Sequence, residues 1–97
     1  MADAMRPIHP GEILREQMKE LGLSANALAS LLRVPANRIT SIINEQRSIT
    51  ADSALRLARY FGTTAEFWMN LQSTYDLRKA EQKSGDRING EIHTRVH

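Results

Sequence analysis

Residues 24–44 read SANALASLLRVPANRITSIIN, and the spacing of their apolar side chains decides the fold. The apolar positions follow one face of a helix up to Pro35 and resume in a new phase after it. Ser24 is a good N-cap for the first helix, and Pro35 suits the first position of the second, where no backbone N–H is needed. The small side chain of Ala29 would oppose Ile39 and let the two helices cross closely. This stretch therefore predicts a helix-turn-helix.

The second predicted helix leaves short polar side chains on the face opposite its isoleucines. Asparagine, serine, threonine and arginine side chains can bond base edges in the major groove of DNA. A solvated helix surface carries the same residue types, so the flanking sequence has to decide between these interpretations. The outward positions are Ala36, Asn37, Arg38, Thr40, Ser41 and Asn44.

Length and composition fit one compact domain. The 97 residues are 41% hydrophobic, and the absence of cysteine excludes a disulfide framework, a thiol nucleophile and a cysteine metal site. No apolar run approaches the ~20 residues of a membrane span, and no segment resembles a secretory leader. We therefore expect a soluble cytoplasmic protein without membrane contact.

Positive charge is concentrated around the helix-turn-helix. The formal net charge is only +2, but residues 24–61 carry five arginines against two acids, and ten of the 13 basic residues are arginine. Arginine binds phosphate and guanine through paired hydrogen bonds that lysine cannot reproduce. The excess is modest for one chain, so two copies side by side would bind nucleic acid better.

The rest of the chain predicts three further helices, at residues 10–21, 51–61 and 65 to about 83. Glycine follows each of the first two and suits the left-handed backbone that ends many helices. Thr63, with Glu66 three residues later, forms a capping box before the last helix. The expected apolar stripes are Ile13, Leu14, Met18 and Leu21; Ala54, Leu55, Leu57, Ala58 and Phe61; and Phe67, Trp68, Leu71, Tyr75 and Leu77.

The expected fold class is all-α, a five-helix repressor-type helix-turn-helix domain with a short C-terminal tail. Residues 1–8 would form a flexible N-terminal arm, residues 9–83 the DNA-binding domain, and residues 84–97 the tail. Apolar and polar residues alternate in the tail, as in a strand, but its apolar residues are also four apart, as in a helix. A lone strand has nothing to pair with in a helical domain, so it would need a partner chain. A strand, a helix and a disordered tail therefore all stay open.

Several segments together resemble a known family. They are His9-Pro10-Gly11-Glu12, Asn37-Arg38-Ile39, Arg47-Ser48-Ile49-Thr50-Ala51-Asp52, Ala54-Leu55-Arg56-Leu57-Ala58, Glu66-Phe67-Trp68-Met69-Asn70-Leu71-Gln72 and Tyr75-Asp76-Leu77. Over residues 8 to 80 the chain is similar to the HigA-type (VapI-like) antitoxins of the xenobiotic-response-element helix-turn-helix class. The resemblance implies a homodimeric, sequence-specific repressor of its own operon that neutralises a small basic HigB-type toxin, a RelE-like enzyme that cleaves messenger RNA.

Two positions depart from the pattern of this family. Arg33 stands where most such motifs carry glycine, because the backbone there tends to a positive φ that costs other residues about 1 kcal/mol. Ala25 stands where many repressors carry a glutamine that bonds the DNA backbone. Asn26 or the Ser24 hydroxyl could replace that contact.

Two other classes of function compete with this interpretation. A stand-alone helix-turn-helix transcriptional regulator with no toxin partner would share every feature of the motif. An enzyme would need paired carboxylates or a glycine-rich phosphate loop, which the organised region lacks. The three histidines, His9, His93 and His97, are scattered between the termini. We therefore expect no catalytic site, no metal and no cofactor.

The predicted DNA contacts fall into two groups. Ala36, Asn37, Thr40 and Ser41 would face base edges, while Arg38 would reach a base or a phosphate, or instead form an ion pair on the helix surface. Phosphate contacts are expected at helix N-termini, at the turn and in the loop after the second predicted helix of the motif, the recognition helix. Those candidates are Ser24, Asn26, Arg33 and Arg47, and a solvated arginine is the alternative for Arg47.

The protein partners would use other surfaces. Trp68, Leu71 and Tyr75, with the tail, are the expected contacts to a second copy, although Phe67, Trp68 and Leu71 could instead complete the core of their own domain. A basic toxin would be attracted by carboxylates away from the recognition helix. The available acids are Asp3, Glu12, Glu16, Glu20, Asp76 and Glu81.

Overall fold

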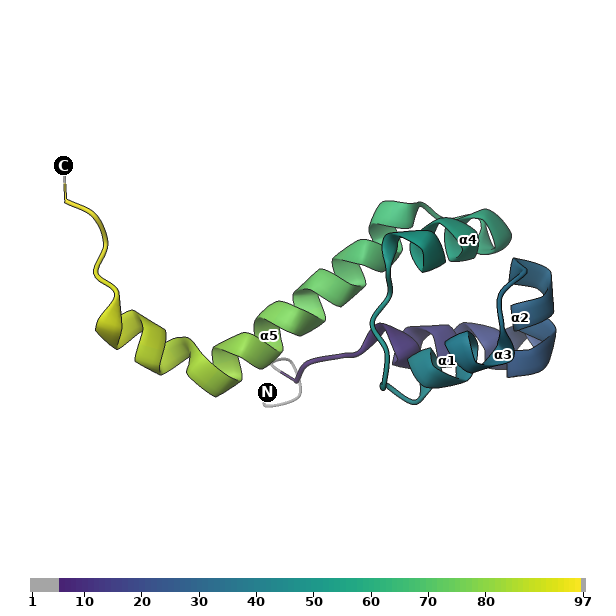
Figure 1. Ribbon diagram of the computed structural model, residues 1–97, viewed down its shortest axis with the longest axis horizontal. Coiled ribbons are helices and arrows are strands. Elements are labelled where there is room, and N and C mark those ends of the chain that lie inside the picture. Colours follow the sequence, from purple (N-terminus) through teal and green to yellow (C-terminus); the bar gives the residue numbers. More distant parts are fainter. Residues whose placement is uncertain (1–5, 97) are drawn as a thin grey trace.

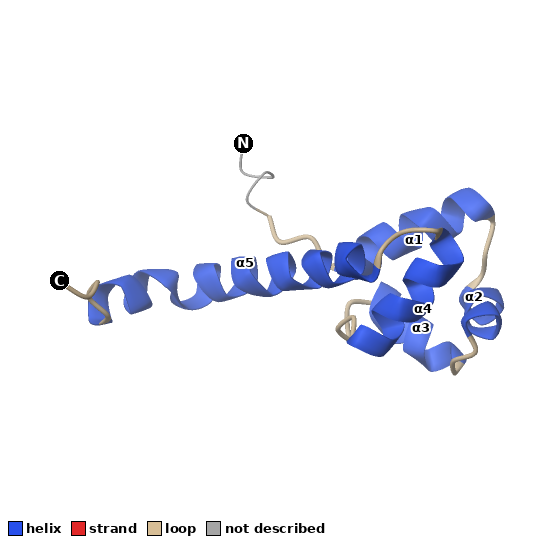
Figure 2. Ribbon diagram, turned by 90° about the horizontal axis from the view of Figure 1, so that it is seen from above, coloured by secondary structure: helices blue, strands red, loops and turns tan. Residues whose placement is uncertain are grey.

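The computed structural model describes residues 6–96, and within them the chain forms five α-helices and no strand, so the expected all-α class is confirmed. The first four helices form a compact group, and the fifth packs on it with its N-terminal part and then projects away (Figures 1 and 2). The chain is accordingly elongated, with extents of 53 × 29 × 21 Å. The helices are α1 (Pro10–Leu21), α2 (Ala25–Leu32), α3 (Ala36–Ile43), α4 (Ala51–Phe61) and α5 (Ala65–Glu91).

The ends of the helices follow local chemistry with two corrections. Gly22 and Gly62 end α1 and α4 in the left-handed conformation, as expected. Pro35 is the N-cap of α3 and not its first helical residue, because its ψ of 146° is extended. The prediction of a capping box from Thr63 is also wrong, because Thr64 is the N-cap of α5. The Thr63 hydroxyl instead accepts a hydrogen bond from the indole N–H of Trp68 at 2.9 Å.

The core lies where α1 to α4 meet the beginning of α5. Ala29 and Ile39 are both buried there, in agreement with the close crossing of α2 and α3. Three leucines expected on apolar stripes are exposed instead: Leu21 by 58%, Leu55 by 63% and Leu77 by 62%. Leu21 lies at the very end of its helix and Leu77 on the projecting part of α5. The core residues are Leu14, Met18, Leu28, Ala29, Leu32, Ile39, Ile42, Ile49, Ala54, Leu57, Ala58 and Trp68.

The His-Pro-Gly-Glu segment is a helix cap that also brings α1 against α3. His9 accepts a hydrogen bond from the N–H of Gly11 at 2.9 Å through Nδ1, and Glu12 accepts one from the N–H of His9 at 3.3 Å. A Cβ atom at Gly11 would overlap the carbonyl oxygen of Ile42 in α3. Glycine is therefore required at this position by the close approach of the two helices.

The first turns of α5, which contain Trp68 and Gln72, hold the loop between α3 and α4 in place. Trp68 has no exposed surface, and one turn later Gln72 is buried as well. The side-chain oxygen of Gln72 accepts a hydrogen bond from the N–H of Ile49 at 2.7 Å, and its amide nitrogen donates to Asp76 at 3.0 Å. The loop that follows α3 is thus tied to α5.

The fifth helix is longer than expected. It has 27 residues and ends at Glu91 instead of near Lys83, so the strand interpretation is wrong for most of the tail. Residues 92–96 have no regular secondary structure. The C-terminal half of α5 bends (Figure 1), and the Ser84-Gly85 pair lies in this half, a combination at which helices often bend. Most of the proposed N-terminal arm, residues 1–5, lies outside the described residues.

Candidate nucleic-acid interface

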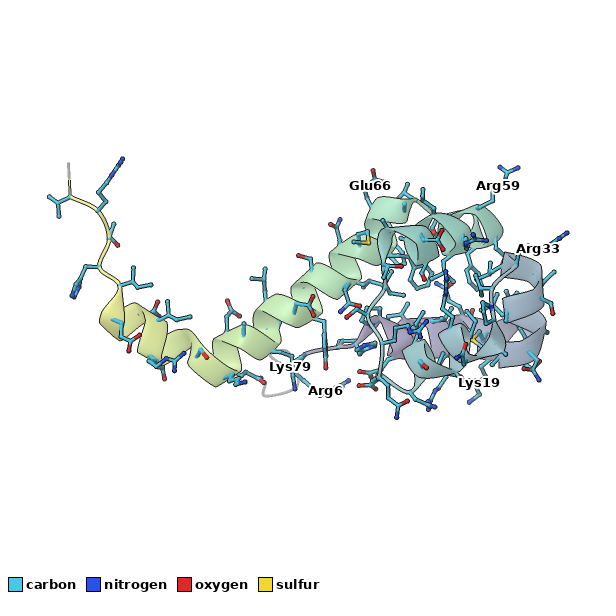
Figure 3. All side chains as sticks on the ribbon, viewed as in Figure 1. Arg6, Lys19, Arg33, Arg59, Glu66 and Lys79 are labelled. Carbon is cyan, nitrogen blue, oxygen red and sulfur yellow. The ribbon has the colours of Figure 1, made fainter. Side chains whose placement is uncertain are left out.

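The turn between α2 and α3 closes without glycine. Arg33 has a φ of 61°, which confirms the expected left-handed backbone at this position. Its N–H bonds to the carbonyl oxygen of Ser30 at 3.2 Å, and the N–H of Val34 bonds to that of Ala29 at 3.0 Å. These bonds satisfy two carbonyl groups in the last turn of α2, in the pattern of a Schellman motif. The Arg33 side chain points away from the domain (Figure 3).

The outer face of α3 carries the polar residues that the sequence placed there. Asn37 is exposed, and Ala36, Thr40 and Ser41 are half-buried, while Ile39 on the other face is buried. The Thr40 hydroxyl donates to the carbonyl oxygen of Asn37 at 3.3 Å, so its oxygen still offers lone pairs to a partner. The part of the α3 surface that stays accessible therefore carries one exposed amide residue and two half-buried hydroxyl residues.

Arg38 forms an ion pair, the alternative that the sequence left open. Its Nη1 donates to Oδ2 of Asp52, in the first turn of α4. The same oxygen accepts a bond from Nε of Arg56 at 2.8 Å, and Nη1 of Arg56 donates to the carbonyl oxygen of Leu32 at 2.8 Å. Hydrogen bonds from Arg56 and then Arg38 hold the pKa of Asp52 below its usual value. The carboxylate therefore stays charged near neutral pH.

Arginines from outside the motif cap the ends of both motif helices. Arg56 of α4 bonds to the last residue of α2, and Arg15 of α1 donates from Nη2 to the carbonyl oxygen of Ile43, the last residue of α3, at 2.9 Å. Neither α2 nor α3 has a basic residue in its own last turn. These two cations therefore complement the helix dipoles and fix the orientation of the motif in the domain.

The residues expected to bind phosphate lie at the start of α2, at the turn and in the loop after α3. Ser24 caps α2 by accepting the N–H of Ala27 at 3.1 Å, and its hydroxyl hydrogen remains able to donate. Asn26, in the first turn of α2, and Arg47, in the loop after α3, are exposed. Asn44 is exposed too, and its side-chain oxygen lies 3.4 Å from Nη2 of Arg15.

The backbone conformation of an acidic residue beside α3 was not predicted from the sequence. Glu45 follows directly after the C-cap of α3 and has a φ of 63°, a conformation that favours glycine. Its N–H bonds to the carbonyl oxygen of Ile42 at 3.0 Å. Nothing in the residue type signals this backbone conformation, since glutamate rarely adopts it.

The residues expected to contact a second copy separate into two kinds. Trp68 is fully buried in its own domain, so its assignment to a partner surface is wrong. Leu71 is half-buried and lines a groove of about 350 Å³ together with Ile8, Ile13 and Phe67. Tyr75 is half-buried, and its ring packs against the buried His9 ring in a T-shaped arrangement with 4.8 Å between the centroids. Leu71 and Tyr75 thus keep surface that a partner could cover.

The acids considered for toxin binding are also in different environments. Glu12 forms an ion pair with Arg6, and Asp76 accepts a hydrogen bond from Gln72. Glu16 and Glu20 on α1 and Glu81 on α5 are exposed. Asp3 lies outside the described residues. Within residues 6–96, no group of three or more His, Asp or Glu side chains could hold a metal ion, and no helix is long and apolar enough to cross a membrane.

Known proteins share both the motif and the whole arrangement of helices. The helix-turn-helix family model matches residues 14–68. Virulence-associated protein I of Dichelobacter nodosus is 61% identical over 79 residues, which are 80% of this chain and 73% of that protein. Antitoxin HigA-1 of Vibrio cholerae is 38% identical over 73 residues, which are 74% of this chain and 69% of that protein.

Solved structures are similar over nearly the full length. An addiction module antidote protein of the HigA family from Coxiella burnetii has a TM-score of 0.91 and 57% identity, covering 93% of this chain and 99% of that one. Antitoxin HigA of Pseudomonas aeruginosa, solved with the higBA promoter, has a TM-score of 0.91 and 51% identity, covering 94% of this chain and all of that one.

Proposed function

Because the chain belongs to the HigA-type antitoxins of the helix-turn-helix family, we propose that it represses its own operon by sequence-specific DNA binding and neutralises a small, basic, RNA-cleaving toxin of the HigB type. The observation that carries the DNA-binding part is the outward polar face of α3 on a rigidly held motif. The same HigA-type membership supports a cytoplasmic location, where operon and toxin are found.

Base readout would come from the exposed face of α3. The Asn37 amide suits a bidentate contact with adenine, and the hydroxyls of Thr40 and Ser41 can donate or accept. The half-buried Ala36 offers a methyl group for the methyl of thymine. Asn44, at the end of the helix, would then lie nearer the DNA backbone than the bases.

Phosphate contacts would fix the register of the motif on the duplex. The N-terminus of α2 offers the Ser24 hydroxyl and the Asn26 amide, and the exposed Arg33 and Arg47 supply two positive charges on either side of α3. These contacts carry affinity but no sequence information. The affinity of the chain for DNA should therefore fall steeply with salt.

A symmetric dimer would place two recognition helices on one operator. Half-sites one turn of DNA apart, about 34 Å, require a two-fold pair of motifs. The surface that supports this pairing is the groove beside Leu71, with Tyr75 on the same helix. Sedimentation should give twice the chain mass of 11.0 kDa. Leu71→Ser should weaken the dimer, whereas Leu55→Ser, an exposed leucine on α4, should not.

The toxin would bind away from α3, so that the complex can still repress. The exposed carboxylates of Glu16 and Glu20 on α1 supply charge that attracts a basic protein. Co-expression with the adjacent reading frame tests this part: growth arrest by that product alone should be relieved by this chain. No rescue and no complex, with DNA binding intact, would support the stand-alone regulator.

Fluorescence anisotropy tests the DNA-binding part. The purified chain is titrated into a duplex from the region upstream of its gene and into an unrelated duplex of equal length and composition. A specific repressor should prefer the first by about 1,000-fold or more. Equal affinity for both duplexes would overturn the proposal.

A further inference from the structure

An acidic side chain lies within bonding distance of the recognition helix. Asp52 is in the first turn of α4, and its side chain keeps 54% of its surface exposed. A carboxylate next to a DNA-binding helix repels phosphate groups and lowers affinity. Its favourable position at the N-terminus of α4 is a sufficient structural reason for an acid there, but that reason does not account for its bond to α3.

The carboxylate is itself held in place. Oδ2 of Asp52 accepts bonds from Arg38 and from Arg56, and Arg56 is anchored by its second bond, to the carbonyl oxygen of Leu32. The C-terminal end of α2 and the N-terminal part of α4 therefore determine where the carboxylate lies. The carboxylate in turn determines where the guanidinium of Arg38 lies, one residue from the outward-facing Asn37.

An arginine held in this way differs from a free one. A guanidinium has five N–H donors, and Asp52 takes one donor of Arg38, so the others can still bond DNA. They can do so only from one place, because the side chain is fixed and only 28% exposed. The carboxylate also cancels much of the attraction of Arg38 for any nearby phosphate.

We propose, as an extension of the proposed repressor function, that Asp52 is a positioning residue for specificity: it confines Arg38 to the contact that the operator offers and suppresses binding to unrelated DNA. Loss of its charge would release Arg38 to follow the nearest phosphate. Binding to unrelated DNA would then strengthen while the preference for the operator falls.

The experiment compares Asp52→Asn with the wild-type chain on the operator duplex and on the unrelated duplex, from about 50 to 300 mM salt. One added phosphate contact should steepen the salt dependence on unrelated DNA by about 0.9 in log affinity per log salt. At the low end of salt this should raise affinity for unrelated DNA by about 3- to 10-fold and reduce the operator preference.

Two further variants separate positioning from charge and from stability. Glu66→Gln removes an acid from the first turn of α5 and should leave the operator preference unchanged. Arg38→Ala in the Asp52→Asn background should abolish the gain on unrelated DNA. All chains are compared well below their thermal unfolding midpoints, where each is folded.

The outcomes that overturn the inference are distinct. An Asp52→Asn chain with the salt dependence and operator preference of Glu66→Gln would exclude a positioning role. A gain that persists without Arg38 would show that only net charge matters. A wild-type chain without operator preference would overturn the proposed function and this inference together.

Discussion

Arg15 of α1 donates a hydrogen bond at 2.9 Å to the carbonyl oxygen of Ile43, which ends the recognition helix. The helix that would read DNA is therefore capped by a helix that lies outside the helix-turn-helix motif. Arg56 does the same for α2 through Leu32. Changes remote from the DNA face should consequently alter DNA binding through the position of α3.

Arg15→Ala should lower the free energy of unfolding by about 1 kcal/mol, because an exposed but charge-assisted hydrogen bond is lost. Operator affinity should fall as well, since the end of α3 is no longer held. Lys79→Ala, which removes an exposed cation from the middle of α5, is the control for charge. Urea unfolding and anisotropy measure the two effects, and equal losses in both variants would contradict the capping role.

Gly11→Ala and Gly90→Ala should have opposite effects on stability. A methyl group at Gly11 overlaps the carbonyl oxygen of Ile42, so α1 and α3 must separate, at a cost of about 1–3 kcal/mol. Gly90 lies in α5 with nothing within 4 Å of an added Cβ, and alanine there should stabilise by roughly 0.5–1 kcal/mol. Urea unfolding checks both signs, and a tolerated Gly11→Ala would refute the close approach.

Glu45→Gly should stabilise the chain relative to Glu45→Ala. Both variants remove the negative charge, but only glycine relieves the left-handed backbone at φ 63°. The expected difference in the free energy of unfolding is about 0.5–1 kcal/mol, after the larger entropy of unfolded glycine is counted. Both variants should bind DNA more tightly than the wild type, and equal stability of the two would show that the backbone is unstrained.

Stability should decrease as the pH falls below about 4. The hydrogen bond from Arg6, followed by the backbone N–H of His9, holds the pKa of Glu12 below its usual value. A carboxyl with a lowered pKa in the folded state contributes stability above its unfolded pKa, and this contribution is lost as the pH falls through the folded pKa. The thermal unfolding midpoint of Glu12→Gln should therefore depend less on pH than that of the wild type. The same pH dependence in both chains would exclude Glu12 as a cause of the acid destabilisation.

Local signals in the sequence carried most of the fold. The opposition of Ala29 and Ile39 and the glycines after α1 and α4 follow from residues close by in the sequence, whereas the positive φ of Arg33 was expected from the resemblance to the helix-turn-helix family. The end of α5 did not follow. The residues after Leu77 are mostly good helix formers, and a glycine costs a helix only about 1 kcal/mol, so Gly85 and Gly90 do not end it.

The contacts that organise the site could not be predicted, because they join distant parts of the chain. Ile49 and Gln72 are 23 residues apart, and Arg15 and Ile43 are 28 apart. Periodicity shows which residues share a face of one helix but not which neighbour covers that face. This is why Trp68 could be assigned to a partner surface although it fills the core of its own domain.

Asn37→Ala and Arg47→Ala should weaken DNA binding in different ways. Asn37 is exposed on the outer face of α3, so its loss should cost roughly 1–3 kcal/mol on the operator and less on unrelated DNA. Arg47 is exposed in the loop after α3, so its loss should weaken binding to both duplexes alike and reduce the salt dependence by about 0.9. Anisotropy titrations on both duplexes at several salt concentrations separate the two. Equal losses on both duplexes for Asn37→Ala would remove Asn37 from base readout, and an unchanged salt dependence for Arg47→Ala would make it a solvated arginine.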